Sequence, residues 1–218
     1  MRSVIMEEPG KVVVEDRPMP TLLESTDAVI KLAASCICGS DLWPYRGAQP
    51  EPVDHQQMGH EYIGEVIEVG DDVKTVKPGD FVVGSFCISC GECATCRDGY
   101  PSRCLKAIAA GDGFIGMRSN GTQAEYARIP FADGTLVKTP AYPTAEQIPH
   151  LMAASDVLGT GWYAADAAKA GPGKAIVVVG DGAVGLGAVI GAKQLGAEKI
   201  IMMSRNPKRQ ELAKQFGA

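Results

Sequence analysis

Short runs rich in valine and isoleucine alternate with turn-forming residues along roughly the first 140 positions of the chain. Gly, Pro and Asp residues separate these runs, and VKPGD at 76–80 is a clear turn signal between two of them. Many short strands divided by turns are typical of a barrel or a sandwich. We therefore expect residues 1–150 to form a β-rich domain. The runs that predict its strands are 11–16, 27–35, 62–70, 80–85, 123–129 and 134–138.

The pattern changes near residue 141. Residues 143–168 are alanine-rich with a helical period, and the continuous apolar run AIVVVG at 175–180 is typical of a buried parallel strand. A helix at 183–197, a strand at 199–204 and a helix at 207–217 are predicted to follow. This alternation is the beginning of a doubly wound parallel sheet, in residues 151–218. Only 38 residues follow Gly180, so we expect this second domain to be incomplete in the chain.

Composition narrows the class of protein. Hydrophobic residues make up 45% of the chain and charged residues 22%, which is ordinary for a globular protein. The net charge of −5 argues against nucleic acid or an anionic membrane as the main partner. The N-terminal segment lacks the apolar stretch of a signal peptide, and no apolar run reaches the roughly 20 residues of a membrane span. Seven cysteines without a signal peptide indicate a reducing compartment, so we expect a cytoplasmic protein.

Four of the cysteines follow the spacing C-x2-C-x2-C-x7-C, within a lobe at about 87–105. Four thiolates at this spacing can enclose one zinc ion in a structural site that has no open position. A disulfide framework is the alternative, and the absence of secretory features disfavours it. The sequence therefore predicts a structural zinc site. Its ligands would be Cys90, Cys93, Cys96 and Cys104.

A glycine motif follows the first strand of the second domain. The segment Gly180-Asp181-Gly182-Ala183-Val184-Gly185 matches G-x-G-x-x-G between a predicted strand and a predicted helix. In such loops the first glycine permits the turn, the second admits a pyrophosphate and the third allows the helix to pack on the strand. The helix N-terminus would offer its N–H groups to the phosphates. The alternative is a glycine-rich turn that binds nothing.

The end of the second strand indicates which cofactor the motif would bind. An acidic residue there would favour NAD(H), because it accepts a hydrogen bond from the ribose 2′-hydroxyl. This chain has Ser204 instead, followed by Arg205, Lys208 and Arg209. Guanidinium groups bind a 2′-phosphate well, so NADP(H) is favoured over NAD(H). The alternative is that these basic residues are simply the solvated start of a helix.

Three further polar residues lie in apolar or glycine-rich settings: Cys38, His60 and Asp156. Singly, each has a common structural explanation, as a buried thiol, a core histidine and a helix N-cap. Together with the cysteine lobe and the glycine motif, they resemble the zinc-dependent alcohol dehydrogenases of the medium-chain dehydrogenase/reductase family. The matching segments appear in the family's order along the whole chain. They are Cys38-Gly39-Ser40-Asp41, Gly59-His60-Glu61, the four lobe cysteines, Asp156 and Gly180 to Gly185.

The resemblance implies a fold, a reaction and a set of site residues. The fold would be α/β plus β: a GroES-like β-rich catalytic domain, then the first half of a Rossmann doubly wound parallel sheet. Hydride would pass between a small alcohol, aldehyde or ketone and NADP(H), with zinc polarising the substrate oxygen. Two zinc ions per subunit and a homodimer or homotetramer would be expected. Family members are usually longer, so the resemblance also suggests truncation.

The resemblance also assigns roles around the catalytic zinc. Cys38, His60 and Asp156 would be its ligands, leaving one position open. Ser40 would hydrogen-bond the reacting oxygen, and Glu61 would lie beside the metal. Asp41 would orient a ligand, expected to be His60. Trp43 stands where some relatives place a relay histidine, and it is expected to line the substrate pocket.

Several other interpretations stay open at this stage. A zinc-free quinone reductase of the same fold would have no use for the cysteine lobe or for Cys38 and His60. A zinc-knuckle nucleic-acid binder is disfavoured by the negative charge. A non-catalytic zinc-binding fragment and an NAD(H)-dependent polyol or aldehyde dehydrogenase of the same family remain alternatives.

Overall fold

The computed structural model describes residues 1–48, 54–111, 113–116 and 121–218. The chain divides into two compact units, Met1–Met152 and Ala153–Ala218. Within the described residues, no helix is long and apolar enough to cross a membrane.

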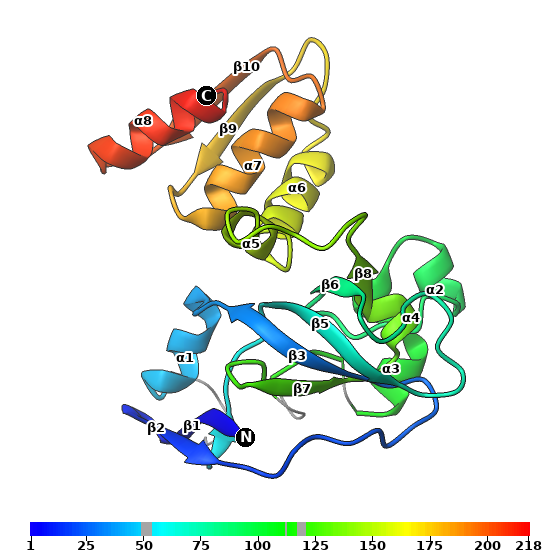
Figure 1. Ribbon diagram of the computed structural model, residues 1–218. Coiled ribbons are helices and arrows are strands. Elements are labelled where there is room, and N and C mark those ends of the chain that lie inside the picture. Colours follow the sequence, from blue (N-terminus) through cyan, green and yellow to red (C-terminus); the bar gives the residue numbers. More distant parts are fainter. Residues whose placement is uncertain (49–53, 112, 117–120) are drawn as a thin grey trace. The chain divides into compact units, whose positions relative to one another are not determined.

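The first unit is built on a five-stranded antiparallel sheet (Figure 1). Its strand order is β7-β3-β5-β6-β8, so strands far apart in the sequence lie side by side. Its strands are β3 (Ala28–Ser35), β5 (Tyr62–Val69), β6 (Phe81–Gly84), β7 (Tyr126–Ile129) and β8 (Leu136–Lys138). A second, three-stranded sheet has the order β2-β1-β4. Its strands are β1 (Arg2–Glu8), β2 (Lys11–Asp16) and β4 (Gln56–Gln57).

Most of these strands match the runs expected from the sequence, but β4 was not predicted, and the strand expected at 123–129 begins only at Tyr126. Strand β1 was not predicted, because only three of its residues in a row are apolar. It forms by antiparallel pairing with β2 around a turn in which Gly10 has a φ of +83°. The strand expected at 134–138 begins only at Leu136, because Gly134 and Thr135 belong to the short helix α4 (Ala132–Thr135).

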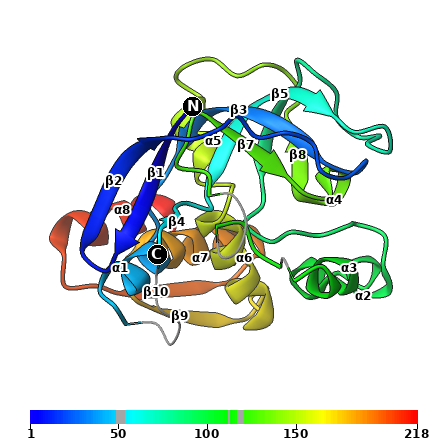
Figure 2. The same cartoon turned by 90° about the horizontal axis from the view of Figure 1, so that it is seen from below.

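The cysteine lobe packs onto the core of this unit instead of forming a separate one. It contains the short helices α2 (Ala94–Arg97) and α3 (Leu105–Ala109), which are labelled in Figures 1 and 2. Cys104 and Ala107 are buried in the same hydrophobic cluster as Ile30, Val66 and Val82 of the sheet. The loop that holds the four cysteines is therefore anchored by the sheet as well as by its own contacts.

The helical stretch expected at 143–168 is interrupted. It forms α5 (Ile148–Met152), the last element of the first unit, and α6 (Val157–Ala167), the first helix of the second. Asp156 is the N-cap residue of α6, and its φ of −148° lies outside the helical region. The periodicity of the sequence is helical on both sides, but the backbone at Asp156 cannot continue one helix into the next.

The second unit begins a doubly wound fold, as the sequence predicts. The strands β9 (Ala175–Val179) and β10 (Lys199–Met203) are parallel, with Val179 opposite Met203. Helix α7 (Ala183–Gln194) connects them and packs beside α6, and α8 (Pro207–Phe216) follows β10 (Figure 1). The core of this unit lies between the helices and the strand pair and includes Ala165, Val189 and Ile200.

Close approach of α6 and α7 leads to a first prediction. A Cβ atom at Gly161 would lie 2.4 Å from the backbone nitrogen of Ala188 and 2.5 Å from the carbonyl oxygen of Val184. Gly161→Ala should therefore force the helices apart and lower the free energy of unfolding by about 2–3 kcal/mol. Gly159→Ala in the same helix is the matched control, because nothing lies within 4 Å of its added Cβ.

The control substitution should stabilise the chain by about 0.5–1 kcal/mol, because alanine favours the helix over glycine. Urea unfolding of both variants measures the difference. Equal midpoints for the two variants would contradict this account of the helix contact.

Candidate functional site

The pairing of β3 with β5 brings the first group of candidate ligands together. These strands are antiparallel, and Ser35 at the end of β3 lies opposite Tyr62 at the start of β5. The residues that follow β3 and those that precede β5 therefore meet at one end of the pair. One ligand atom each of Cys38, His60 and Glu61 lies within 4.8 Å of the other two. A thiolate, an imidazole and a carboxylate together form a donor set that suits zinc.

Asp41 contacts both Cys38 and His60. It lies in a short 3-10 turn, Gly39–Asp41, that starts directly after Cys38. One carboxylate oxygen accepts a hydrogen bond of 2.9 Å from the backbone N–H of Cys38. The other lies 3.2 Å from Nδ1 of His60. A carboxylate on Nδ1 fixes the orientation of the ring and leaves Nε2 as the atom that can bind a metal.

The Nε2 side of the His60 ring faces Ser40, whose Oγ lies 3.3 Å from it. The Ser40 hydroxyl, which was expected to hydrogen-bond the reacting oxygen, therefore lies beside Nε2, the ring atom that can bind a metal. Trp43 lies in α1 (Leu42–Tyr45) and its side chain is exposed. Its contact with substrate stays a prediction.

Glu61 and two residues that were not predicted complete the surroundings of this group. Glu61 is buried at 4% exposure. Burial raises the pKa of the Cys36 thiol, and the negative charge of Glu61 raises it further. The side-chain amide of Gln123 donates to the carbonyl oxygen of Cys36 at 3.1 Å and to Asp41 at 3.4 Å. Gln123 is 82 positions from Asp41 in the chain, and no local motif marks it.

Asp156 lies in the second unit, at the start of α6. Its carboxylate accepts a hydrogen bond of 2.8 Å from the hydroxyl of Thr160, one helical turn later. Its role as the third ligand of a catalytic zinc rests on the resemblance and stays a prediction.

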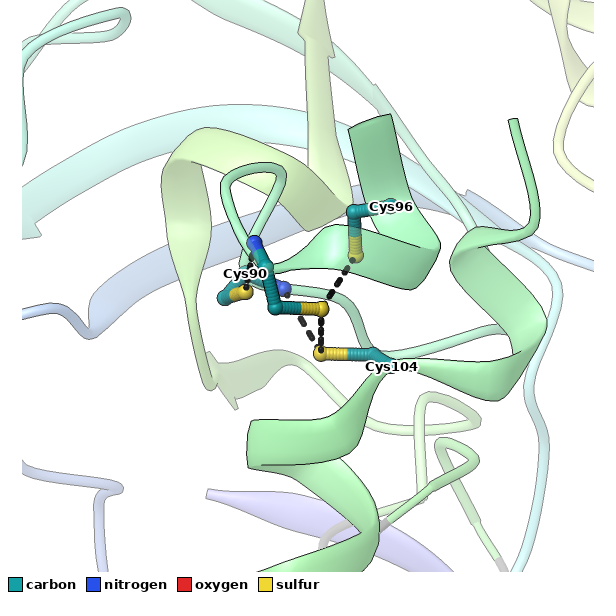
Figure 3. Close-up of side chains that lie close together, drawn as sticks. Cys90, Cys96 and Cys104 are labelled. Atoms are coloured by element: carbon teal, nitrogen blue, oxygen red, sulfur yellow. Dashed lines mark hydrogen bonds between the residues drawn. The ribbon is translucent and has the colours of Figure 1, made fainter. Parts of the chain in front are cut away.

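The four lobe cysteines form the second group of candidate ligands. Their sulfur atoms all lie within 4.8 Å of one another, and Cys90, Cys96 and Cys104 point toward a common centre (Figure 3). The sulfur of Cys93 lies 3.4 Å from that of Cys96 and 3.9 Å from that of Cys104. A tetrahedral zinc with Zn–S bonds of about 2.3 Å requires sulfur atoms about 3.8 Å apart. The spacing therefore fits a four-cysteine zinc site.

The electrostatic surroundings of these thiols also favour a bound cation. The Thr95 hydroxyl beside Cys93, with backbone N–H groups, lowers the pKa of Cys93 to about 5. Burial, followed by the neighbouring Cys93, raises the pKa of Cys96 to about 12. Four thiolates this close repel one another, and a divalent cation removes that penalty. Backbone N–H groups of Cys90 and Ala107 also point at the sulfur of Cys104, at 3.3 and 3.5 Å.

The glycine motif forms the turn between β9 and α7. Gly180 has a φ of +111°, a conformation that favours glycine. A Cβ atom at Gly185 would lie 2.2 Å from the carbonyl oxygen of Gly180, so the helix can pack on the turn only without a side chain. At Gly182, the N-cap residue of α7, nothing lies within 4 Å of an added Cβ. The loop thus leaves space at the helix N-terminus where a phosphate could approach the backbone.

Two of the residues expected to bind a 2′-phosphate contact Asp181, the residue between the first two glycines. The hydroxyl of Ser204 donates to one Asp181 oxygen at 2.6 Å, and the guanidinium of Arg209 contacts the other at 2.9 Å. Arg205 is exposed. Asp181 was not among the predicted site residues, although a charged residue inside the glycine motif is a visible signal.

Comparison with known proteins relates this chain to alcohol dehydrogenases. Residues 24–141 match the family described as the alcohol dehydrogenase GroES-like domain. The chain is 40% identical over 224 residues to zinc-type alcohol dehydrogenase B of Aspergillus flavus, covering 100% of this chain and 50% of that protein. It is 36% identical over 224 residues to the medium chain reductase/dehydrogenase ucsI of Acremonium sp, covering 100% of this chain and 74% of that protein.

A solved structure supports the same relationship. The alcohol dehydrogenase TADH from Thermus sp. ATN1 superposes with a TM-score of 0.86 at 36% identity, over 100% of this chain and 62% of that one. The chain thus spans about half the length of the Aspergillus relative and three quarters of the Acremonium relative. From the matched family domain, these relatives and the common fold, the chain belongs to the zinc-dependent alcohol dehydrogenases of the medium-chain dehydrogenase/reductase family.

Proposed function

We propose that this chain carries the zinc-binding catalytic domain and the first half of the cofactor domain of an NADP(H)-dependent alcohol dehydrogenase. The reaction is the transfer of hydride between the carbon of a small alcohol or carbonyl compound and the nicotinamide ring. The observation that carries the proposal is the group formed by Cys38, His60 and Glu61, with Asp41 fixing the orientation of His60.

Cys38 and His60, joined by Asp156 from the second unit, are the proposed ligands of the catalytic zinc. Bound there, zinc would supply Lewis-acid polarisation of the substrate oxygen. Glu61 is the acidic neighbour in the same group, and its burial keeps its carboxylate away from bulk water. The four lobe cysteines would hold a second, structural zinc, which would give two zinc ions per subunit.

The chain's own residues prepare the site for proton movement. Asp41 keeps Nδ1 of His60 engaged, so that the ring presents Nε2 in one tautomer. Ser40 lies next to that nitrogen and provides a hydroxyl that can accept the proton of an alcohol substrate and pass it to solvent. Trp43 has no imidazole to extend this route, and we assign it to the wall of the substrate pocket.

The residues after β10 support NADP(H) as the cofactor. Ser204 stands where an acidic residue would select NAD(H), and Arg205 and Arg209 follow it. A guanidinium can make two charge-assisted hydrogen bonds to a phosphate, and such bonds contribute about 1.5–3 kcal/mol each. We expect kcat/KM with NADP⁺ to exceed that with NAD⁺ by about tenfold or more, since 1.4 kcal/mol corresponds to a factor of ten.

The test combines metal analysis with activity. The assay is made on the 218-residue chain, and on the longer protein wherever its natural sequence continues. Zinc per chain is measured by elemental analysis, and reduced cofactor is followed with primary and secondary alcohols and, in reverse, with aldehydes and ketones. We expect two zinc ions and chelator-sensitive turnover that prefers NADP⁺. A protein with one zinc and no turnover would be the non-catalytic alternative, and a preference for NAD⁺ would refute the cofactor assignment alone.

A further inference from the structure

Asp181 lies where the two parallel strands of the second unit end. Because Val179 of β9 is opposite Met203 of β10, the residues that follow each strand meet at the same edge. Asp181 follows β9 by two positions, and Ser204 directly follows β10. Parallel strands thus bring a carboxylate of the glycine motif against the proposed phosphate-binding segment, 23 positions away in the chain.

Asp181 engages both kinds of donor that a 2′-phosphate would use. One carboxylate oxygen accepts the Ser204 hydroxyl at 2.6 Å, and the other forms an ion pair of 2.9 Å with Arg209. Further hydrogen bonds hold the segment around these contacts. The Asn206 side chain caps α8 by accepting from the backbone N–H groups of Lys208 and Arg209, and the Gln210 amide donates to the Ser204 carbonyl at 2.7 Å.

The net positive charge at this edge is therefore smaller than Arg205, Lys208 and Arg209 alone would give. The hydrogen bond from Ser204, and then the one from Arg209, lower the pKa of Asp181, so its carboxylate is ionised at neutral pH. Its negative charge offsets that of Arg209. Among the described residues, Arg205 and Lys208 form no ion pair, and they supply the positive charge that remains.

We propose that Asp181 is a specificity-determining residue of the adenosine ribose subsite, whose carboxylate a 2′-phosphate must displace from Ser204 and Arg209. An unphosphorylated ribose brings no competing charge, and the same carboxylate can accept a hydrogen bond from its 2′-hydroxyl. Asp181 thus weakens the preference for NADP(H) that the basic residues create, and the protein accepts both cofactors. The inference rests on the proposed function, because it assumes that this edge binds the ribose of a nicotinamide dinucleotide.

The test is the affinity of four probes for matched variants, measured by calorimetry: NADP⁺, NAD⁺ and the adenosine fragments 2′,5′-ADP and 5′-AMP. Asp181→Asn removes the charge and keeps the shape. It should tighten NADP⁺ and 2′,5′-ADP binding by about tenfold or more, the order expected when one charge is removed beside a phosphate near a protein surface. NAD⁺ and 5′-AMP affinities should not increase and should fall by less than about threefold, because neither carries the 2′-phosphate and the amide oxygen of asparagine can still accept a hydrogen bond from the 2′-hydroxyl.

Two further variants show whether the effect belongs to this contact. Glu198→Gln removes one exposed negative charge from the opposite end of β10 and should change no affinity. Arg209→Gln combined with Asp181→Asn should lose most of the gain for NADP⁺, because the released guanidinium is what binds the phosphate.

The outcomes separate this inference from the proposed function. Unchanged or weaker NADP⁺ binding by Asp181→Asn overturns the inference, since Asp181 would then position Arg209 for the phosphate, and it leaves the NADP(H) assignment standing. A wild-type protein that prefers NAD⁺, together with an Asp181→Asn variant that gains NADP⁺ affinity, supports the inference and refutes the proposed preference. Failure of all proteins to bind any of the four probes refutes both.

Discussion

Replacing Cys104 by serine is expected to remove one zinc ion per chain and to destabilise the first unit strongly. Cys104 is 1% exposed, lies in the cluster that joins the lobe to the sheet, and accepts two backbone hydrogen bonds at its sulfur. Serine keeps the size but supplies no thiolate, so three close thiols lose the cation that holds them together. We expect the free energy of unfolding to fall on the order of 4 kcal/mol, within the range for losing a structural metal.

Elemental analysis and thermal unfolding measure the two parts of this prediction. Cys87→Ser is the matched control, because Cys87 is also buried and lies three positions before Cys90 but is outside the group of four sulfurs. The control should keep its zinc and lose stability only because a polar hydroxyl replaces a buried thiol. A Cys104→Ser protein with unchanged zinc content and unfolding temperature would exclude the lobe as a zinc site.

Replacing His60 by alanine should have the largest effect on activity and leave the lobe zinc in place. The substitution removes one of the three groups that meet at the end of β3 and β5 and leaves Asp41 without the ring it holds. We expect the zinc content to fall from two ions to one and kcat/KM to fall by about a thousandfold or more, as for loss of a group on which stabilisation of the transition state depends. Elemental analysis and steady-state kinetics provide the measurements.

A graded variant and a control make the result specific. Asp41→Asn keeps the shape beside His60 and removes the charge, and it should weaken zinc binding about 10- to 100-fold, as losses around a metal ligand do. His150→Ala changes an exposed histidine of α5 and should alter neither zinc content nor rate. Two zinc ions in the His60→Ala protein would show that His60 is not a ligand. Equal zinc affinity in the Asp41→Asn protein would show that the contact of the Asp41 carboxylate with His60 does not strengthen zinc binding.

The two metal groups differ in how far the sequence could predict them. All four lobe cysteines fall within fifteen positions, so their spacing alone indicates that they can reach one ion. Cys38 and His60 are far apart in the chain and come together only because β5 pairs with β3. Taken singly, each residue has a common structural explanation. What identified them was the resemblance, and what brings them together is the register that places Ser35 opposite Tyr62. That register depends on side-chain packing across a whole sheet.

The same contrast holds in the second unit. Gly180 and Gly185 are predictable, because a positive φ and a close backbone contact are local requirements that only glycine meets well. The pairing of Asp181 with Ser204 and Arg209 was not predicted. It requires two strands to run in parallel and to end together, and the spacing within either segment carries no information about the other.

The sequence by itself determined most of the longer strands and helices, the cysteine lobe and the glycine motif, because each depends on short-range periodicity or fixed spacing, and the combination of these motifs with Cys38, His60 and Asp156 indicated the family. The tertiary structure decided that the helical stretch at 143–168 breaks before Asp156 and that the Gln123 amide donates a hydrogen bond to Asp41. It also decided that Asp181 accepts hydrogen bonds from Ser204 and Arg209, two of the proposed phosphate donors. These features depend on backbone geometry and on contacts between distant segments. Such contacts form only when packing and hydrogen bonding select one arrangement of the folded chain.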